Sequence, residues 1–305
     1  MVRGWIARRA GGAAVGLLAD RVLGEPPPEL HPVAGFGQLM GTVERGLYRD
    51  AVGPGAVFAA TGLGLGLVAG RVAHSTALGV AMSAAGRMLR QEARVIEGRL
   101  GHGDLDGART RLHSLCGRDS RELDHSGMAA AVIESLAENT VDAVVAPALW
   151  ATALGAPGAL GYRAINTMDA MVGHHSPRYE RFGSKAARLD DAANFVPARV
   201  TAALVAAVCT RRAVAVGRAV RRDAPAHPSP NAGVAEAAFA AALGVELGGP
   251  LRYGDRVEHR PRLGDGPRPG PADITRAVRL ADQVELALVG LLALASLFLR
   301  AGRGK

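Results

Sequence analysis

Three carboxylates recur at a spacing of four residues near the middle of the chain. Glu134, Glu138 and Asp142 would line one face of a continuous helix, with Asn139 beside them. Three negative charges on one stripe repel one another unless a cation or an arginine lies between them. Oxygen ligands of this type suit Mg²⁺, whose coordination shell substrate phosphates commonly complete. The spacing therefore indicates a Mg²⁺ site formed by Glu134, Glu138 and Asp142; a solvated helix end paired with arginines is the alternative.

A second group of acidic and amide side chains follows, interleaved with arginines. The acidic and amide residues are Asn166, Asp169, Asp190, Asp191 and Asn194, and the arginines are Arg163, Arg188 and Arg199. Such a group can bind a metal–phosphate complex, because a guanidinium holds phosphate or carboxylate oxygens bidentately. A structural ion-pair network would use the same residue types, so this pattern leaves both interpretations open.

Two proline-containing loops are further candidates. His31 follows a proline-rich turn, and that segment is either a substrate loop or an ordinary turn. Asn231 lies in a loop that leads into a helix containing Glu236. The backbone N–H groups at such a helix start can bind an anion, although many loops have this composition.

Familiar phosphate-binding motifs are absent. Neither Lys185 nor Lys305 lies in a G-x4-G-K-[ST] sequence, so the chain contains no P-loop. Residues 64–69 match G-x-G-x-x-A, but they lie inside an apolar run. There the small residues predict close helix packing instead of dinucleotide binding.

Composition narrows the functional classes. The chain has 305 residues, of which 49% are hydrophobic and 4% aromatic, and its formal net charge is +8. The basic charge does not come with an arginine–aromatic stripe of the kind that single-stranded nucleic-acid binders use. Two cysteines are too few for a disulfide framework or a zinc ribbon. Apolar blocks that alternate with charged ones favour a membrane protein that does not bind nucleic acid.

The elements that position the candidate residues are therefore expected to be membrane helices. Residues 52–70 carry no charge, and their length is close to the roughly 20 residues that a bilayer core requires. Glu285 stands at the edge of the last apolar block, where we expect its charge to cost little. The apolar blocks are residues 10–19, 52–86, 141–160, 195–209 and 284–299.

No strand pattern is convincing, and residues 252–271 are rich in glycine, proline and arginine, which predicts a loop. Prolines and glycines interrupt blocks 141–160 and 195–209, so hydropathy leaves them open as buried helices, re-entrant pairs or spans. We predict an all-α, polytopic integral membrane protein with polar helical loops, in a single domain over residues 1–305.

In their order along the chain, these motifs resemble those of the CobD/CbiB family, the adenosylcobinamide-phosphate synthases of cobalamin biosynthesis. The resemblance extends from about residue 19 to 254. Its most specific parts are E-S-x-A-E-N-x-x-D at 134–142 and N-T-x-D-x-M-x-G at 166–173. Further matches are D-R-V-L-G-E-P-P at 20–27, G-R-D-S at 117–120, R-L-D-D-A-A-N at 188–194 and S-P-N-A-G at 229–233.

The resemblance implies an amide-forming ligase, multi-pass in the cell membrane, with its motif loops facing the cytoplasm. Such an enzyme joins adenosylcobyric acid to (R)-1-amino-2-propanol or its O-2-phosphate, with ATP as a substrate and Mg²⁺ as the cofactor. The lipid bilayer and other cobalamin-biosynthesis enzymes are the further partners that it implies. A membrane transporter of a corrinoid or another anion, and a non-catalytic membrane scaffold, are the alternatives.

Within the matched motifs we assign two kinds of site residue. The catalytic residues are expected to be Glu134, Glu138, Asp142 and Asp169. The residues expected to bind substrate or phosphate are His31, Arg118, Asp119, Asn139, Arg163, Asn166, Arg188, Asp190, Asp191, Asn194, Arg199 and Asn231.

Overall fold

The structure is a computed structural model that describes residues 2–27, 31–116, 120–174, 176–253 and 256–301. Its internal contacts divide the chain into two compact units. Unit 1 comprises Met1–Ala85, Asp142–Asn194 and Leu288–Lys305, and unit 2 comprises Gly86–Val141 and Phe195–Ala287. The single domain expected over residues 1–305 stays a prediction.

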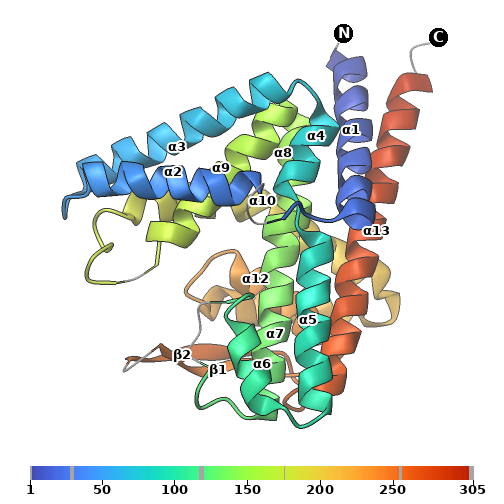
Figure 1. Cartoon of the computed structure of the whole chain (residues 1–305). Helices are drawn as coiled ribbons and strands as arrows, with labels where there is room; N and C mark the ends of the chain where they lie inside the picture. The colour runs from blue at the N-terminus through green and yellow to red at the C-terminus, as the bar shows by residue number, and fades with distance from the viewer. Residues whose placement is uncertain (1, 28–30, 117–119, 175, 254–255, 302–305) are drawn as a thin grey trace. The chain divides into compact units, whose positions relative to one another are not determined.

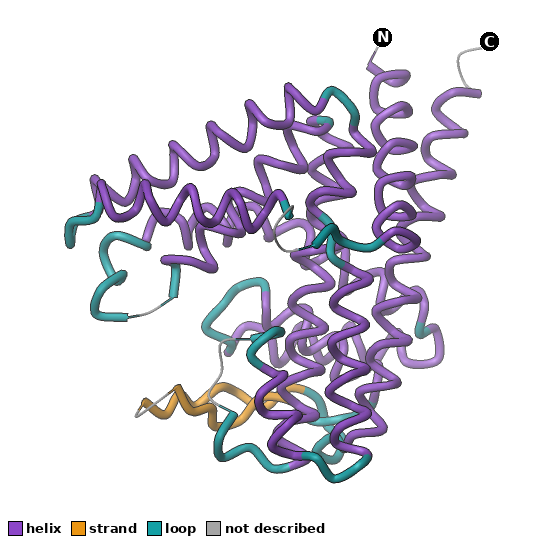
Figure 2. The backbone as a smooth tube through the Cα atoms, in the orientation of Figure 1, coloured by secondary structure: helices purple, strands orange, loops and turns teal. Residues whose placement is uncertain are grey.

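Helices form most of the described chain, which confirms the all-α prediction (Figure 2). The α-helices are α1 (Val2–Leu23), α2 (Pro32–Leu47), α3 (Val52–Ala73), α4 (Thr76–Ser83), α5 (Gly86–Gly101), α6 (Leu105–Leu112), α7 (His125–Thr140), α8 (Ala146–Leu154), α9 (Ala156–Val172), α10 (Ser184–Val208), α11 (Ala213–Asp223), α12 (Ala232–Leu243) and α13 (Pro271–Ala301). A π-helical segment, η2 (Val141–Val145), joins α7 to α8, and 3-10 turns occur at η3 (Thr210–Arg212) and η4 (Ala224–Ala226).

Three helices in the described part of the chain are long and apolar enough to cross a membrane. They are α3, α10 and α13, with 22, 25 and 31 residues. The expected block 52–86 does not form one long helix, because α3 ends at Ala73 and His74 adopts a left-handed conformation with φ of 53°. Ser75 then caps α4 by accepting a hydrogen bond from the N–H of Leu78.

In unit 1, α3 packs along α9 through a stripe of glycines (Figure 1). Gly62, Gly66 and Gly70 are spaced by four and face this partner helix. A Cβ atom at Gly66 would lie 2.8 Å from the Cβ of Ala164, which is too close for two carbon atoms. The small residues of this apolar run therefore permit the helices to approach. Within the 64–69 run that was expected to pack, Gly66 does so, whereas Gly64 has no neighbour within 4 Å.

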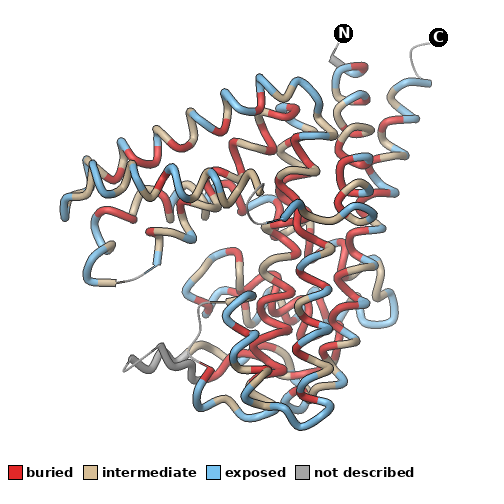
Figure 3. Tube along the Cα trace, viewed as in Figure 1, coloured by how far each residue is buried: buried red, intermediate tan, exposed pale blue. Residues whose placement is uncertain are grey.

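In unit 2, α7 and α12 form a core rich in alanine, and both helices are buried along most of their length (Figure 3). All the residues of α12 except Ala232 are buried. A helix that is apolar on every side is stable only when other elements cover it completely. This core matters for function because Glu134 on α7 and Glu236 on α12 are buried within it.

Unit 2 also contains an antiparallel hairpin, with β1 at Leu247–Tyr253 and β2 at Arg256–Leu263. The expectation of no strand, and of a loop over residues 252–271, is wrong for this segment. Gly248 and Gly249 both have positive φ, and the pairing is irregular between them. Glycines and a bulge remove the alternation that normally identifies a strand in a sequence.

A buried ion pair joins two helices of unit 2. Arg90 on α5 donates a hydrogen bond to Glu285 on α13 and lies 3.5 Å from Asp282. The Glu285 side chain is only 1% exposed, so it is not the inexpensive edge charge that the sequence suggests. The guanidinium of Arg90 offsets the cost of removing the Glu285 carboxylate from water, because a buried charge is tolerated when it is paired.

Replacing Arg90 with methionine is expected to lower the free energy of unfolding by about 3–5 kcal/mol, because Glu285 keeps its buried charge without this partner. The double variant Arg90→Met/Glu285→Met should recover much of that loss. Denaturant unfolding in detergent would measure both. The exposed pair of Arg99 and Asp104 provides the control, since Arg99→Met should cost at most about 1 kcal/mol. Equal losses for the buried and the exposed pair would contradict this prediction.

Candidate active site

Unit 1 contains a partly buried polar network, the aspartate–asparagine cluster, formed by Asp142, Tyr162, Asn166, Asp190 and Asn194. The amide nitrogen of Asn166 donates to Asp142 at 3.1 Å and to Asp190 at 3.3 Å. Asn194 donates to the second oxygen of Asp190 at 3.0 Å. The hydroxyl of Tyr162 lies 2.8 Å from the amide oxygen of Asn194 and 3.2 Å from Asp142. Two carboxylates from different segments are thus held at one amide group.

Asp142 joins this cluster from an irregular stretch of helix. Asp142 lies in η2, where the α-helical hydrogen-bond pattern changes to a π-helical one. Segments of this kind are often found at functional sites. From this segment Asp142 contacts residues of α9.

Further charged residues of unit 1 border this cluster. Arg163 donates to Asn166 at 3.2 Å, and its buried Nε atom has no hydrogen-bond partner within the described ranges. Burial, followed by the negative charges of Asp190 and Asp191, raises the pKa of Asp169 to about 7. The carboxylates here therefore repel one another, and Asp169 is shifted toward its neutral form.

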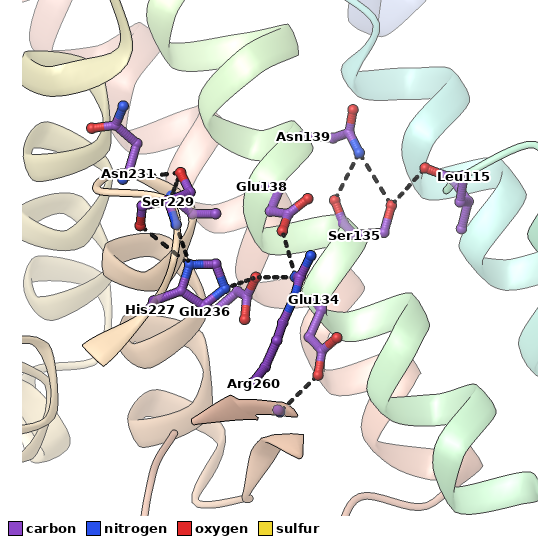
Figure 4. A network of polar contacts seen from close by, with 12 residues as sticks. Leu115, Glu134, Ser135, Glu138, Asn139, His227, Ser229, Asn231, Glu236 and Arg260 are labelled. Atoms are coloured by element: carbon purple, nitrogen blue, oxygen red, sulfur yellow. Dashed lines mark hydrogen bonds and ion pairs between the residues drawn. The ribbon is translucent and has the colours of Figure 1, made fainter. Parts of the chain in front are cut away.

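A second network, in unit 2, is the glutamate–histidine cluster of Glu134, Glu138, His227, Glu236 and Arg260 (Figure 4). Glu134 accepts a hydrogen bond from the backbone N–H of Gly248, at 2.8 Å. The Nη1 atom of Arg260 lies 3.8 Å from Glu236 and 3.9 Å from Glu138. The Nε2 atom of His227 lies 3.6 Å from Glu236. α7, α12, the loop after η4 and β2 all contribute to this cluster.

Burial sets the electrostatics of this second network. The pKa of Glu236 is raised well above its ordinary value, first by burial and then by the negative charges of Glu138 and Glu134. Burial and the nearby Arg260 lower the pKa of His227. Both groups are therefore shifted toward their neutral forms, as expected for side chains removed from water.

Several other candidate residues have structural contacts. Asn231 accepts a hydrogen bond from Arg199 at 2.7 Å, and Asn139 donates to Ser135. His31 caps the N-terminus of α2, where its Nδ1 atom accepts from two backbone N–H groups, and its Nε2 atom lies 2.8 Å from Glu25. Contacts of this kind position loops and helix ends.

The remaining candidates are exposed, are partly exposed or lie outside the described part of the chain. Arg188 is exposed on α10, and Asp191 is partly exposed on the same helix. Arg118 and Asp119 lie outside the described residues. Their expected roles in binding substrate or phosphate stay predictions.

The stripe of Glu134, Glu138 and Asp142 is divided between the two networks. The first two contact the hairpin residues Gly248 and Arg260, whereas Asp142 contacts Tyr162 and Asn166. Among the described residues, no group of three or more histidine, cysteine, aspartate or glutamate side chains is arranged to hold a metal ion. The Mg²⁺ site expected from Glu134, Glu138 and Asp142 stays a prediction.

Comparison with known proteins shows which family shares these segments. A protein-family model described as CobD/Cbib protein matches residues 13–281. The chain belongs to the CobD/CbiB family. The resemblance expected from the sequence motifs is confirmed.

Curated members of the CobD/CbiB family support the same assignment. A protein of Mycobacterium tuberculosis (strain H37Rv) is 48% identical over 295 residues, which cover 91% of this chain and 92% of the relative. A protein of Chromobacterium violaceum is 43% identical and covers 88% and 91% of the two chains. One of Klebsiella pneumoniae is 36% identical and covers 90% and 94%. Each is named "Cobalamin biosynthesis protein CobD". No solved structure matches this chain.

Four residues of the two networks in this CobD/CbiB protein are not among the sequence-based candidates. They are Tyr162, His227, Glu236 and Arg260. Glu236 had a usable signal, because it is an isolated carboxylate in an otherwise apolar helix. No sequence feature distinguished Arg260, because it is one arginine among many in a segment that was expected to be a loop.

We expect the Glu236→Gln variant of this CobD/CbiB protein to gain stability relative to the wild type as the pH rises. The folded-state pKa of Glu236 lies above 4.5, its ordinary value. The carboxyl group therefore stabilises the fold fully below pH 4.5 and less as pH rises through its folded pKa. Glutamine does not ionise, so the variant should lack this loss.

Denaturant unfolding of both proteins in detergent, from acidic to alkaline pH, would measure the difference. The groups that face Glu236 are Glu134, Glu138, His227 and Arg260, and they are the same in both proteins. Identical pH dependence of unfolding in the two would contradict the prediction.

Proposed function

We propose that the chain is an amide-forming ligase of cobalamin biosynthesis. It joins a carboxylate of adenosylcobyric acid to the amine of (R)-1-amino-2-propanol or of its O-2-phosphate, and it uses ATP. The observation that carries this proposal is the CobD/CbiB match over residues 13–281, a range that contains both polar networks.

The reaction explains why a site of this kind uses carboxylates and arginines. A carboxylate is a poor acyl donor, whereas transfer of the γ-phosphoryl group of ATP converts it to an acyl phosphate and releases ADP. The amine nitrogen then forms the C–N bond, phosphate leaves, and one proton is released from the ammonium group. Both steps depend on positioning and on positive charge near phosphate oxygens, more than on a protein nucleophile.

The aspartate–asparagine cluster fits the part of the site that handles Mg–ATP. Asp142 and Asp190 share the amide of Asn166, and one or two carboxylates are what Mg²⁺ commonly takes from a protein. When bound, Mg²⁺ supplies positive charge that neutralises the phosphate oxygens. Asn166 and Tyr162 hold the two carboxylates in place, and Arg163 adds a guanidinium that suits a phosphate oxygen.

Three helices of membrane-spanning length and composition support a membrane location. We place the enzyme in the cell membrane with its motif loops on the cytoplasmic side, because ATP is available there.

Membranes that contain the protein would be incubated with ATP, Mg²⁺ and adenosylcobyric acid, and with each amine in turn. We expect an amide product together with ADP and phosphate, and comparison of the amines identifies the preferred one. With verified substrates, absence of amide from both reactions would contradict the proposed function. Transport of a corrinoid into vesicles without ATP cleavage would favour a transporter.

A further inference from the structure

Glu236 is a buried carboxyl group with unsatisfied hydrogen-bonding capacity. Its side chain is 0% exposed, and neither oxygen accepts a hydrogen bond from the described part of the chain. The helix that carries it is otherwise composed of apolar residues and glycine. Burial of such a group is unfavourable unless a partner compensates it. A donor-bearing ligand is one such partner.

A cationic nitrogen already lies between Glu236 and a second carboxylate. The single Nη1 atom of Arg260 is 3.8 Å from Glu236 and 3.9 Å from Glu138 (Figure 4). These are ion-pair distances, and both exceed the 3.2 Å or so that limits a good N–H···O hydrogen bond. The guanidinium of Arg260 is therefore held near both glutamates by charge attraction, and its Nη1 atom is too far from either carboxylate for a hydrogen bond.

Exposure along this network decreases from the surface inward. The side chain of Glu138 is 37% exposed, that of Arg260 is 17% exposed and that of Glu236 is fully buried. Of the two carboxylates, Glu138 is therefore the outer one and Glu236 the inner one. At the inner end, the buried Nε2 atom of His227 has no hydrogen-bond partner in the described ranges. The other ring nitrogen of His227 is 3.1 Å from the backbone nitrogen of Ser229, which orients the ring.

The two carboxylates of this network are best suited to bind a primary ammonium group. An ammonium group is a compact charge with three donors, so it can reach two carboxylates and still contact a third atom. A guanidinium is larger, and its donors have a fixed planar geometry. A divalent metal fits less well, because it would bring two positive charges beside Arg260, whereas an ammonium group brings one.

We propose that Glu236 and Glu138 bind the ammonium group of the amino alcohol that becomes acylated. This inference rests on the proposed function. His227 is a positioning residue that fixes the inner end of the ammonium site.

The test uses the full chain in membranes, with Glu236→Gln as the variant. We expect the KM for 1-amino-2-propanol, or for its phosphate, to rise ~10- to 100-fold. A bound ammonium group favours the ionised form of Glu236, and glutamine cannot ionise to make that charge-assisted contact. Activation of the acid should persist. Hydroxylamine attacks an acyl phosphate without the ammonium site, so the variant should form hydroxamate and release phosphate at the wild-type rate. Glu246→Gln is the matched control, because Glu246 pairs with Arg262 on the same hairpin at 2.8 Å.

Binding measurements separate this inference from the proposed function, because they require no turnover. Calorimetry with 1-amino-2-propanol or its phosphate should show binding to the wild type and weaker binding to Glu236→Gln. Equal affinity, or an unchanged KM, would overturn the ammonium site. Binding of Mg²⁺ alone that depends on Glu236 would also overturn it.

Absence of both hydroxamate and amide in the wild type would instead count against the proposed function. If the Glu236→Gln protein does not fold, Glu138→Gln offers the same binding test at a partly exposed side chain.

Discussion

Asp142→Asn is expected to lower the rate of ATP-dependent amide formation about 10²-fold or more, the scale seen when one preorganised electrostatic contact to a transition state is removed. Asp142 shares Asn166 with Asp190 and lies within hydrogen-bonding distance of Tyr162. The substitution keeps the size of the side chain but removes the negative charge. In the proposed function that charge helps to hold Mg–ATP.

The concentration of Mg²⁺ needed for half-maximal activity distinguishes this role from a structural one. Asp142→Asn should require more Mg²⁺, whereas Tyr162→Phe, which keeps both carboxylates, should mainly reduce stability. Asp50→Asn, at an exposed aspartate of unit 1, is the matched control for loss of one charge. Wild-type turnover and wild-type Mg²⁺ dependence in Asp142→Asn would remove Asp142 from the site.

Glu138→Gln is the second substitution with a large expected effect. We expect the kcat/KM for the amine to fall by about 10²-fold, since charged contacts of this kind are worth roughly 1.5–3 kcal/mol. Without Glu138, the guanidinium of Arg260 is attracted by Glu236 alone. The ammonium group of the amine then competes with Arg260 for a single buried carboxylate.

Stability and membrane insertion should be retained in Glu138→Gln, because the side chain is 37% exposed and glutamine has nearly the same size. Steady-state kinetics with varied amine, together with extraction of the protein from washed membranes, would check both points. Glu97→Gln, at a partly exposed glutamate on α5, is a suitable control. Full activity of Glu138→Gln would show that this carboxylate does not act on substrate.

Local patterns in the sequence were sufficient for much of the helical framework. The uncharged run that begins at residue 52 predicted α3, and its spaced glycines predicted close helix packing. Hydropathy and small-residue spacing act between neighbours in the chain, so they can be recognised without a fold. The hairpin of β1 and β2 escaped prediction, because its glycines and prolines carry no alternation and its strands are stabilised by pairing with each other.

In the candidate site, too, local motifs identified residues, whereas the fold determined their contacts. Sequence motifs identified candidate functional residues, and family membership supports that choice. They are Glu134, Glu138, Asp142, Asn166 and Asp190. The motifs did not indicate that Asp142, in a π-helical turn, contacts Asn166 while Glu138 pairs with Arg260.

The sequence by itself determined the helical class, the family and the residue types that the chemistry requires, because these depend on composition and on motifs within short segments. Only the tertiary structure decided which charges meet. Glu138 and Arg260 are 122 positions apart, and Glu236 becomes a buried carboxyl group only when the hairpin and α7 enclose it. Burial and the charges of distant residues set its pKa and leave its oxygens without hydrogen-bond donors, and neither effect exists before the chain folds.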